Sequence, residues 1–250
     1  MLRNFLVIPI LLLIAVQYSC VKDKPASVIL PSPSTSPVVP VTPSPPPSAS
    51  EKKYLALGDS YTIGQGVQTA ERYPVQTKDW LVANGITGIS NPQIIATTGW
   101  TTANLQSAIL SQNITGPYDA VSLLIGVNDQ FQGADPTGYE TRFTQLIEKS
   151  ISLANSLPSH VFVLSIPDYS VTPFAMPYNV DRIKKQIDEF NEINKRISLS
   201  YNVQYLDITP STREAKSNLA LICSDGLHPS GLEYKKWAER LGPLMKTVLQ

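Results

Sequence analysis

The amino-acid sequence predicts an α/β protein, a three-layer α/β/α sandwich around a parallel sheet of five strands. Five short apolar runs are each followed by a loop and then by an amphipathic stretch, an alternation typical of a parallel sheet with helices on both faces. The amphipathic stretches place apolar residues three or four positions apart, which is the spacing of one face of a helix. The predicted strands comprise residues 54–57, 93–96, 120–125, 161–166 and 203–206.

Three of the predicted helices have clear apolar faces, which we expect to pack on the sheet. They follow the third, fourth and fifth strands along the chain. Their apolar residues are Tyr139, Phe143, Leu146 and Ile147 in the first, Ile183, Ile187, Phe190 and Ile197 in the second, and Leu232, Trp237 and Leu241 in the last.

The N-terminal segment, residues 1–20, has the pattern of a signal peptide. Arg3 precedes an apolar run over residues 5–16, which is too short to span a bilayer but suits the core of a signal peptide, so we expect export. Ser19-Cys20 resembles a bacterial lipoprotein cleavage site, which implies that Cys20 is lipidated and anchors the protein to a membrane. Gln17 departs from that motif, where an apolar residue is usual. The alternative is cleavage by an ordinary signal peptidase, with Cys20 incidental.

Residues 21–52 are predicted to be a disordered linker. Residues 25–50 include nine prolines and seven serines but no aromatic residue, so this stretch has too little apolar surface to bury a core. Proline-rich linkers favour an extended conformation, which at ~3.1 Å per residue gives a reach of about 80 Å. We expect the linker to hold a single folded domain, residues 53–250, clear of the membrane.

Charge and cysteine content exclude several classes of function. Of 20 basic and 20 acidic residues, Arg3, Lys22, Lys24 and Asp23 precede residue 51, which leaves 17 basic and 19 acidic residues and a net charge of −2. Such a domain has no basic field to attract nucleic acid. The two cysteines lie about two hundred residues apart, and neither they nor the two histidines have the spacing of a metal site. We therefore expect no disulfide, metal or cofactor.

Chemically capable residues follow the ends of the predicted strands. Ser60 follows the first strand, Gly99 the second and Asn128 the third, while Asp225 and His228 follow the fifth by a longer loop. Because the carboxyl ends of parallel strands lie at one edge of the sheet, we expect these residues to meet there. A serine hydroxyl becomes a nucleophile when a histidine takes its proton and a carboxylate orients that histidine.

Of the two histidines in the sequence, His228 is the candidate for this catalytic base. The other histidine, His160, is predicted to open the fourth strand. Pro229 suits the first position of a helix, which would place Asp225 and His228 together on the loop that enters the last helix. Each part also has a plainer explanation, because Gly-Asp and Gly-Val-Asn-Asp are ordinary turn sequences and Gly99 serves wherever φ is positive.

Taken together, the four blocks resemble the GDSL, or SGNH, hydrolase family, which is named for its serine, glycine, asparagine and histidine. The matching residues are Ser60, Gly99, Asn128 and His228, and the resemblance covers most of residues 53–250. It implies a flavodoxin-like fold in which Ser60 is the nucleophile, His228 the general base and Asp225 the residue that orients His228. It also implies an oxyanion hole of the Ser60 and Gly99 N–H groups and the Asn128 amide. We interpret Asp129 as structural, because an ionised carboxylate cannot donate a hydrogen bond.

Aromatic residues near these blocks are candidates for the substrate pocket. Tyr61 stands where the family name implies leucine, and Phe131 follows the Asn128 turn. The longest irregular stretch, residues 168–178, carries Tyr169 and Phe174 between prolines, which we interpret as a stiff apolar wall. Packing of the same aromatic residues onto the sheet edge is the alternative.

The sequence thus predicts an ester hydrolase that forms an acyl-enzyme on a serine. No long apolar helix suggests a lipase lid, so small or single-chain acyl esters, such as short-chain esters or lysophospholipids, are favoured as substrates. Carbohydrate O-deacetylation on the same fold and transfer of the acyl group to another acceptor are alternatives. A surface binding module without chemistry is a further hypothesis, although a binder needs no proton relay.

Overall fold

The computed structural model describes residues 51–250. The predicted signal peptide, the predicted lipidation site Cys20 and the predicted linker up to residue 50 lie outside the described residues. Backbone pairing begins at Lys52, whose N–H donates to Gly88 O at 2.7 Å and whose carbonyl accepts from Ser90 N at 3.0 Å. Lys52, the last residue of the predicted linker, is thus hydrogen-bonded to the folded domain. None of the helices within residues 51–250 has both the length and the apolar composition needed to cross a membrane.

The sheet confirms the predicted α/β fold. Its five strands are all parallel and lie in the order β2-β1-β3-β4-β5, the order typical of flavodoxin-like folds. Residues 120–124 and 161–164 are buried throughout, as expected for central strands covered on both faces. The predicted strand ends were wrong by up to two residues; the strands are β1 (Tyr54–Gly58), β2 (Gln93–Ala96), β3 (Ala120–Leu124), β4 (Val161–Leu164) and β5 (Gln204–Leu206).

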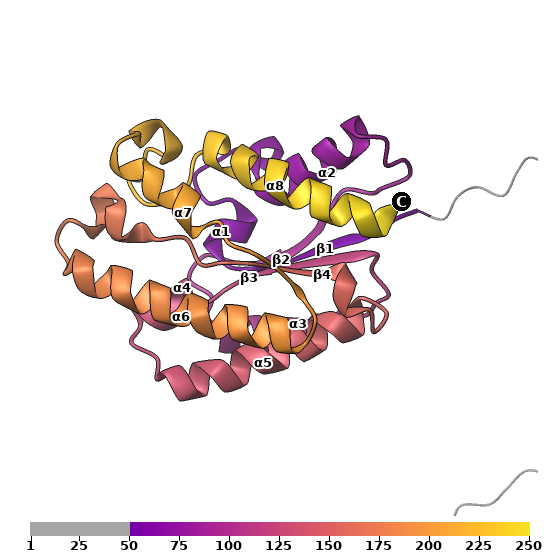
Figure 1. Ribbon diagram of the computed structural model, residues 1–250, viewed down its shortest axis with the longest axis horizontal. Helices are drawn as coiled ribbons and strands as arrows, with labels where there is room; N and C mark the ends of the chain where they lie inside the picture. Colours follow the sequence, from indigo (N-terminus) through magenta and orange to yellow (C-terminus); the bar gives the residue numbers. More distant parts are fainter. Residues whose placement is uncertain (1–50) are drawn as a thin grey trace, which may run out of the picture. The chain divides into compact units, whose positions relative to one another are not determined.

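Helices cover both faces of the sheet (Figure 1). The long helices α2 (Tyr73–Ala83) and α8 (Gly231–Leu249) pack together on one face. The opposite face carries α3 (Thr102–Ser111), α5 (Pro136–Leu153) and α6 (Val180–Ser200). The remaining helices are the short α1 (Ser60–Ile63), α4 (Val127–Phe131) and α7 (Thr209–Thr212), with 3₁₀ turns at Thr69–Glu71, Pro158–His160, Tyr169–Val171, Pro173–Ala175, Arg213–Lys216 and Leu219–Leu221.

The predicted helix faces are buried with one exception, Leu232. All of the predicted residues of α5 and α6 are buried, as are Trp237 and Leu241 of α8, but Leu232 is 59% exposed. Trp237 lies five positions after Leu232. Because five positions span nearly one and a half helical turns, the two side chains lie on different faces of α8. Glu233 occupies the buried face instead, where its Oε1 accepts hydrogen bonds from Trp237 Nε1 at 2.8 Å and Ser211 Oγ at 2.6 Å.

His160 does not open β4 as predicted. It is the last residue of the 3₁₀ turn Pro158–His160, and the strand begins at Val161. Its Nδ1 lies 2.7 Å from the carbonyl oxygen of Asp119 at the start of β3. His160 therefore ties two loops together at the amino end of the sheet, the edge opposite the carboxyl ends of the strands.

The junction of β1 and α1 places Ser60 at the carboxyl edge of the sheet. Gly58 is required there, because a Cβ at this position would overlap Thr62 Oγ1 and the carbonyl oxygen of Leu124. The Asp59 side chain caps α1, accepting a hydrogen bond from the Tyr61 N–H at 3.0 Å. The chain turns at once from strand to helix, so that Ser60 is the first residue of α1.

Asp59 is a buried carboxyl group. The pKa of Asp59 is raised to about 8, mainly by burial and also by the neighbouring Asp129, although the hydrogen bond from the Tyr61 N–H acts to lower it. Within residues 51–250 no group donates a hydrogen bond to its second oxygen, Oδ2. Asp59 is therefore mainly protonated at neutral pH.

Asp59→Asn should remove a pH dependence of stability. The pKa of Asp59 is higher in the folded chain than its ordinary value of 3.8, so folding is favoured by protonation and stability declines as pH rises from about 4 to about 8. For one such group, the free energy of unfolding falls by about 1.4 kcal/mol for each pH unit within this range. The free energy of unfolding, measured with urea at pH 5, 6, 7 and 8, should fall with rising pH more steeply in the wild type than in the Asn variant. Equal pH dependence in the two proteins would contradict the assignment of a raised pKa to Asp59. Asp181→Asn, at an exposed position, is the control.

Candidate active site

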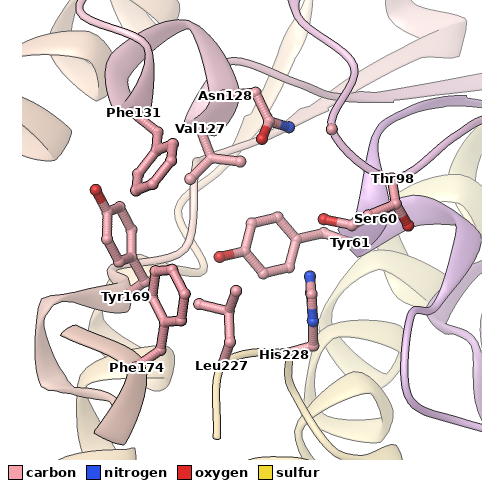
Figure 2. A pocket seen from close by; sticks show the side chains of 11 residues that line it. Ser60, Tyr61, Thr98, Val127, Asn128, Phe131, Tyr169, Phe174, Leu227 and His228 are labelled. Carbon is pink, nitrogen blue, oxygen red and sulfur yellow. The ribbon is translucent and has the colours of Figure 1, made fainter. Parts of the chain in front are cut away.

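A cavity of about 140 Å³ lies at the carboxyl edge of the sheet (Figure 2). Polar groups of Ser60, Asn128 and His228 meet at one side of it, and aromatic rings close the other side. Every residue predicted for the catalytic groups and the pocket lines this cavity, except Asp225, which lies behind His228. The lining residues are Ser60, Tyr61, Thr98, Gly99, Val127, Asn128, Phe131, Tyr169, Phe174, Leu227 and His228.

Asp225 and His228 form a hydrogen-bonded pair. Asp225 Oδ2 lies 2.7 Å from His228 Nδ1, and Asp225 Oδ1 accepts hydrogen bonds from the Leu227 N–H at 2.9 Å and the His228 N–H at 3.0 Å. Burial raises the pKa of Asp225, but these hydrogen bonds outweigh it and hold the pKa below its usual value. Asp225 is therefore ionised at neutral pH, and it holds a proton on His228 Nδ1. Nε2 of a neutral His228 is then free to accept a proton.

The loop that carries this pair leads into α8 as predicted, but Pro229 is not the first residue of that helix and pairs with another part of the loop instead. Pro229 forms an isolated bridge with Ile222, and the Cys223 N–H donates to His228 O at 2.7 Å. The helix begins two residues after Pro229, at Gly231, with Ser230 as its N-cap. Pro229 is thus part of the short ribbon, where its missing N–H costs no hydrogen bond.

Ser60 and His228 lie side by side at the polar end of the cavity (Figure 2). Both residues are buried apart from the surface that faces the cavity. Within residues 51–250 the Ser60 hydroxyl forms no hydrogen bond, including to His228. Catalytic hydrogen bonds of this kind are often long in a free enzyme and shorten when substrate binds.

Three hydrogen-bond donors surround the polar end of the cavity. Across the described part of the chain, neither the Ser60 N–H nor the Gly99 N–H has an acceptor. Gly99 has a φ of +85°, a conformation that suits glycine, and a Cβ there would meet no atom within 4 Å. The Asn128 side chain is oriented by a hydrogen bond from Nδ2 to the Trp100 carbonyl at 3.0 Å, which leaves its second N–H available.

Asp129 joins three helices beside the cavity. It accepts hydrogen bonds from the N–H and the hydroxyl of Thr102 at 2.8 and 2.6 Å, and Arg142 NH2 lies 3.3 Å from its Oδ1. These contacts link α4 to the start of α3 and to α5. The geometry fits the structural role that the sequence predicts, because the side chain points away from the cavity and into the helices.

Aromatic rings form the wall opposite His228. Phe131, Tyr169 and Phe174 pack against one another with ring centroids 6.1 to 6.3 Å apart, and the Tyr169 hydroxyl donates to Gln130 Oε1 at 2.9 Å. The ring of Tyr61 projects between this wall and His228, 5.7 Å from the His228 ring in an edge-to-face arrangement. The predicted irregular stretch 168–178 contains two 3₁₀ turns, and within it Met176 is 80% exposed and lies outside the cavity wall.

Sequence reasoning missed three lining residues. Thr98, Val127 and Leu227 line the cavity, and each is the immediate neighbour of a predicted residue, which is the signal that identifies them.

Cys223, two residues before Asp225, is half-buried. Burial, together with nearby Asp225 and Glu71, raises the pKa of the Cys223 thiol to about 11, so a nucleophilic thiolate is not available there.

One family model matches the chain. The family model described as the GDSL-like lipase/acylhydrolase family matches residues 56–236. No curated protein matches the chain at a significant level. Similar solved structures include TesA, with 16% identity, a TM-score of 0.60 and coverage of 79% of this chain and 99% of that one.

Two further structures have the same fold. The acetylxylan esterase Axe2 of Geobacillus stearothermophilus is 20% identical, with a TM-score of 0.58 and coverage of 78% of this chain and 94% of that one. A lipase/acylhydrolase of Enterococcus faecalis is 18% identical, with a TM-score of 0.57 and coverage of 78% of this chain and 96% of that one. These identities are low and show the shared fold, while the family model matches most of the chain. The protein therefore belongs to the GDSL-like lipase/acylhydrolase family and is an ester hydrolase.

Proposed function

We propose that the protein hydrolyses small or single-chain acyl esters through an acyl-enzyme on Ser60, with His228 and Asp225 completing a catalytic triad. One observation carries the proposal: the Asp225–His228 pair, at 2.7 Å, faces the same small cavity as the Ser60 hydroxyl and three free hydrogen-bond donors. A binding site alone requires neither an oriented histidine nor donors gathered around a hydroxyl group.

Acylation begins when Ser60 Oγ attacks the ester carbonyl carbon and its proton passes to His228 Nε2. Negative charge develops on the former carbonyl oxygen, where the N–H groups of Ser60 and Gly99 and the Asn128 amide stabilise it. Loss of one such donor typically costs about 2.7–4 kcal/mol of transition-state stabilisation. His228 then gives its proton to the leaving alcohol oxygen as the carbon–oxygen bond breaks. Asp225 stabilises the positive charge of the imidazolium.

Deacylation repeats these steps with water in place of Ser60. His228 takes a proton from water, whose oxygen attacks the acyl carbon, and then returns the proton to Ser60 Oγ as the acyl group leaves as a carboxylic acid. An alcohol entering in place of water would make the protein an acyltransferase. The cavity holds roughly four or five water molecules, which suits a short acyl group together with attacking water.

Carbohydrate O-deacetylation is the second candidate. The small cavity suits an acetyl group, and the structurally similar Axe2 is described as an acetylxylan esterase. Release of acetate from acetylated xylan, compared with hydrolysis of p-nitrophenyl acetate, distinguishes a glycan substrate from a simple ester. If the purified protein cleaves only the simple ester, this candidate is rejected.

Ser60→Ala should abolish hydrolysis of p-nitrophenyl acetate and labelling by a fluorophosphonate, because both require an activated serine hydroxyl. Loss of a triad serine lowers kcat on the order of 10⁴- to 10⁶-fold. The full chain is assayed alongside Ser107→Ala, an exposed serine of α3 that serves as the matched control. A folded Ser60→Ala protein that retains activity or labelling would refute the serine mechanism.

Phe174, which lines the active-site cavity but not the neighbouring cavity described below, should limit which acyl groups fit. Phe174→Ala enlarges the cavity, so kcat/KM should rise for longer p-nitrophenyl esters relative to the acetate, by roughly fourfold for each methylene newly accommodated. Tyr169→Ala should act in the same direction. The series from acetate to palmitate measures the effect, with Met176→Ala as the control from the same loop but outside the cavity. An unchanged chain-length preference in folded variants would show that these rings do not bound the acyl site.

The N-terminal sequence supports a proposal about location, namely export and membrane anchoring through lipidated Cys20. The support is the apolar run of residues 5–16, the Ser19-Cys20 pair and the proline-rich linker that follows. Cys20→Ala should abolish incorporation of labelled palmitate and move the protein from the membrane fraction to the soluble fraction. A wild-type protein that takes up no label would instead indicate cleavage by an ordinary signal peptidase.

A further inference from the structure

A second cavity, of about 250 Å³, adjoins the candidate active site. Phe131 and Tyr169 line both cavities, so the two cavities adjoin at these two rings. The second cavity lies between the end of α4 and the first turns of α6, and its other lining residues include four polar ones, Gln130, Asn179, Arg182 and Gln186. Nothing in the proposed triad chemistry uses it.

The amide oxygens that line this cavity are already occupied as acceptors. Gln130 Oε1 accepts from the Tyr169 hydroxyl at 2.9 Å, and Gln186 Oε1 accepts from Gln130 Nε2 at 3.0 Å. Asn179 Oδ1 accepts from the backbone N–H of Arg182 at 3.0 Å, where Asn179 caps α6. These bonds fix the orientation of all three amides, because each oxygen has a defined donor.

The NH₂ groups of two of these three residues, Gln186 and Asn179, are free. Within residues 51–250, neither the Gln186 nor the Asn179 NH₂ group has an acceptor, and the Arg182 guanidinium forms no ion pair. Neither aspartate nor glutamate lines the cavity. A cavity with one guanidinium, two free amide NH₂ groups and no carboxylate suits a ligand group that carries negative charge and accepts several hydrogen bonds.

The second cavity lies on the side of the active site where the acyl group of the ester is expected to bind. The leaving alcohol takes its proton from His228, so it must lie beside that ring. Phe131 and Tyr169 lie across the active-site cavity from His228, with Tyr61 between them (Figure 2). An acyl group bound with its carbonyl at the oxyanion donors therefore extends toward Phe131, and the second cavity lies beyond that ring.

The geometry points to a subsite for a carboxylate at the far end of the acyl group, so that the preferred substrate is a half-ester of a dicarboxylic acid. This inference rests on the proposed serine esterase function. Hydrolysis of such a half-ester gives an alcohol and a dicarboxylate and needs no reactant besides water. A plain alkyl chain reaching the same cavity would displace water from the free donors without replacing its hydrogen bonds.

A matched pair of substrates tests the subsite in the full chain. Monoethyl adipate and ethyl hexanoate have the same ester and the same number of acyl carbons, and they differ only in the terminal carboxylate. The measured quantity is the ratio of their kcat/KM values. Half-esters of succinate and suberate, each paired with the neutral ethyl ester of equal length, show which chain length reaches the cavity.

Two variants should lower that ratio. Arg182→Gln removes the positive charge, and a tenfold loss of preference for the adipate ester is the rough expectation for a charge-assisted hydrogen bond. Gln186→Glu keeps the oxygen that accepts from Gln130 but adds negative charge to the cavity, which should repel the carboxylate. Lys195→Gln removes one charge from an exposed position of α6 that does not line the cavity, and should leave the ratio unchanged.

The outcomes separate this inference from the proposed function. If hydrolysis of ethyl hexanoate depends on Ser60 but Arg182→Gln and Lys195→Gln give the same ratio as the wild type, the subsite is refuted while the esterase remains. If Ser60→Ala retains activity, the proposed function itself fails. Calorimetric binding of monoethyl adipate to Ser60→Ala, compared with Ser60→Ala/Arg182→Gln, measures the subsite without turnover. Equal affinities, or no binding to either protein, would also refute it.

Discussion

The candidate active site depends on the parallel register of the three strands β2, β1 and β3. Gly58 pairs with Ala96 on one side and with Leu124 on the other, so the three strands end at one level. The next few residues of each strand therefore emerge side by side and supply Ser60, Gly99 and Asn128. A shift of register would separate the nucleophile from two of its three donors. The lack of room for a Cβ at Gly58 helps to fix this arrangement, because strand and helix are in contact there.

The histidine reaches the site by a different route. Asp225 and His228 stand on a short antiparallel ribbon in which residues 222 and 223 pair with residues 229 and 228. Gly226, with a φ of +73°, allows the tight turn at the tip of the ribbon. This loop is fixed by its own hydrogen bonds and by the α8 helix that follows. The two halves of the site thus come from separate parts of the chain and meet across the cavity.

Charge is distributed unevenly around the nucleophile. Asp59, next to Ser60, is buried and its raised pKa keeps it mainly neutral near pH 7, whereas hydrogen bonds keep Asp225 ionised. One carboxyl group therefore supports the fold of the β1–α1 turn without placing a negative charge behind Ser60. The other provides the charge that an imidazolium needs. Beyond the aromatic wall, the second cavity presents a cation and amide donors, so the two cavities differ in chemistry although they share Phe131 and Tyr169.

The sequence by itself determined the α/β class, the positions of Ser60, Gly99 and Asn128 shortly after the ends of three strands, and His228 as the candidate base. These follow from local patterns, because buried parallel strands are short apolar runs and their loops lie at one edge. Only the tertiary structure decided that Glu233 and not Leu232 faces the core, and that Pro229 belongs to a ribbon. It also decided which aromatic rings bound the cavity and which amide groups keep free donors. Those outcomes depend on contacts such as that between Gln130 and Gln186, residues 56 positions apart, which no local pattern encodes.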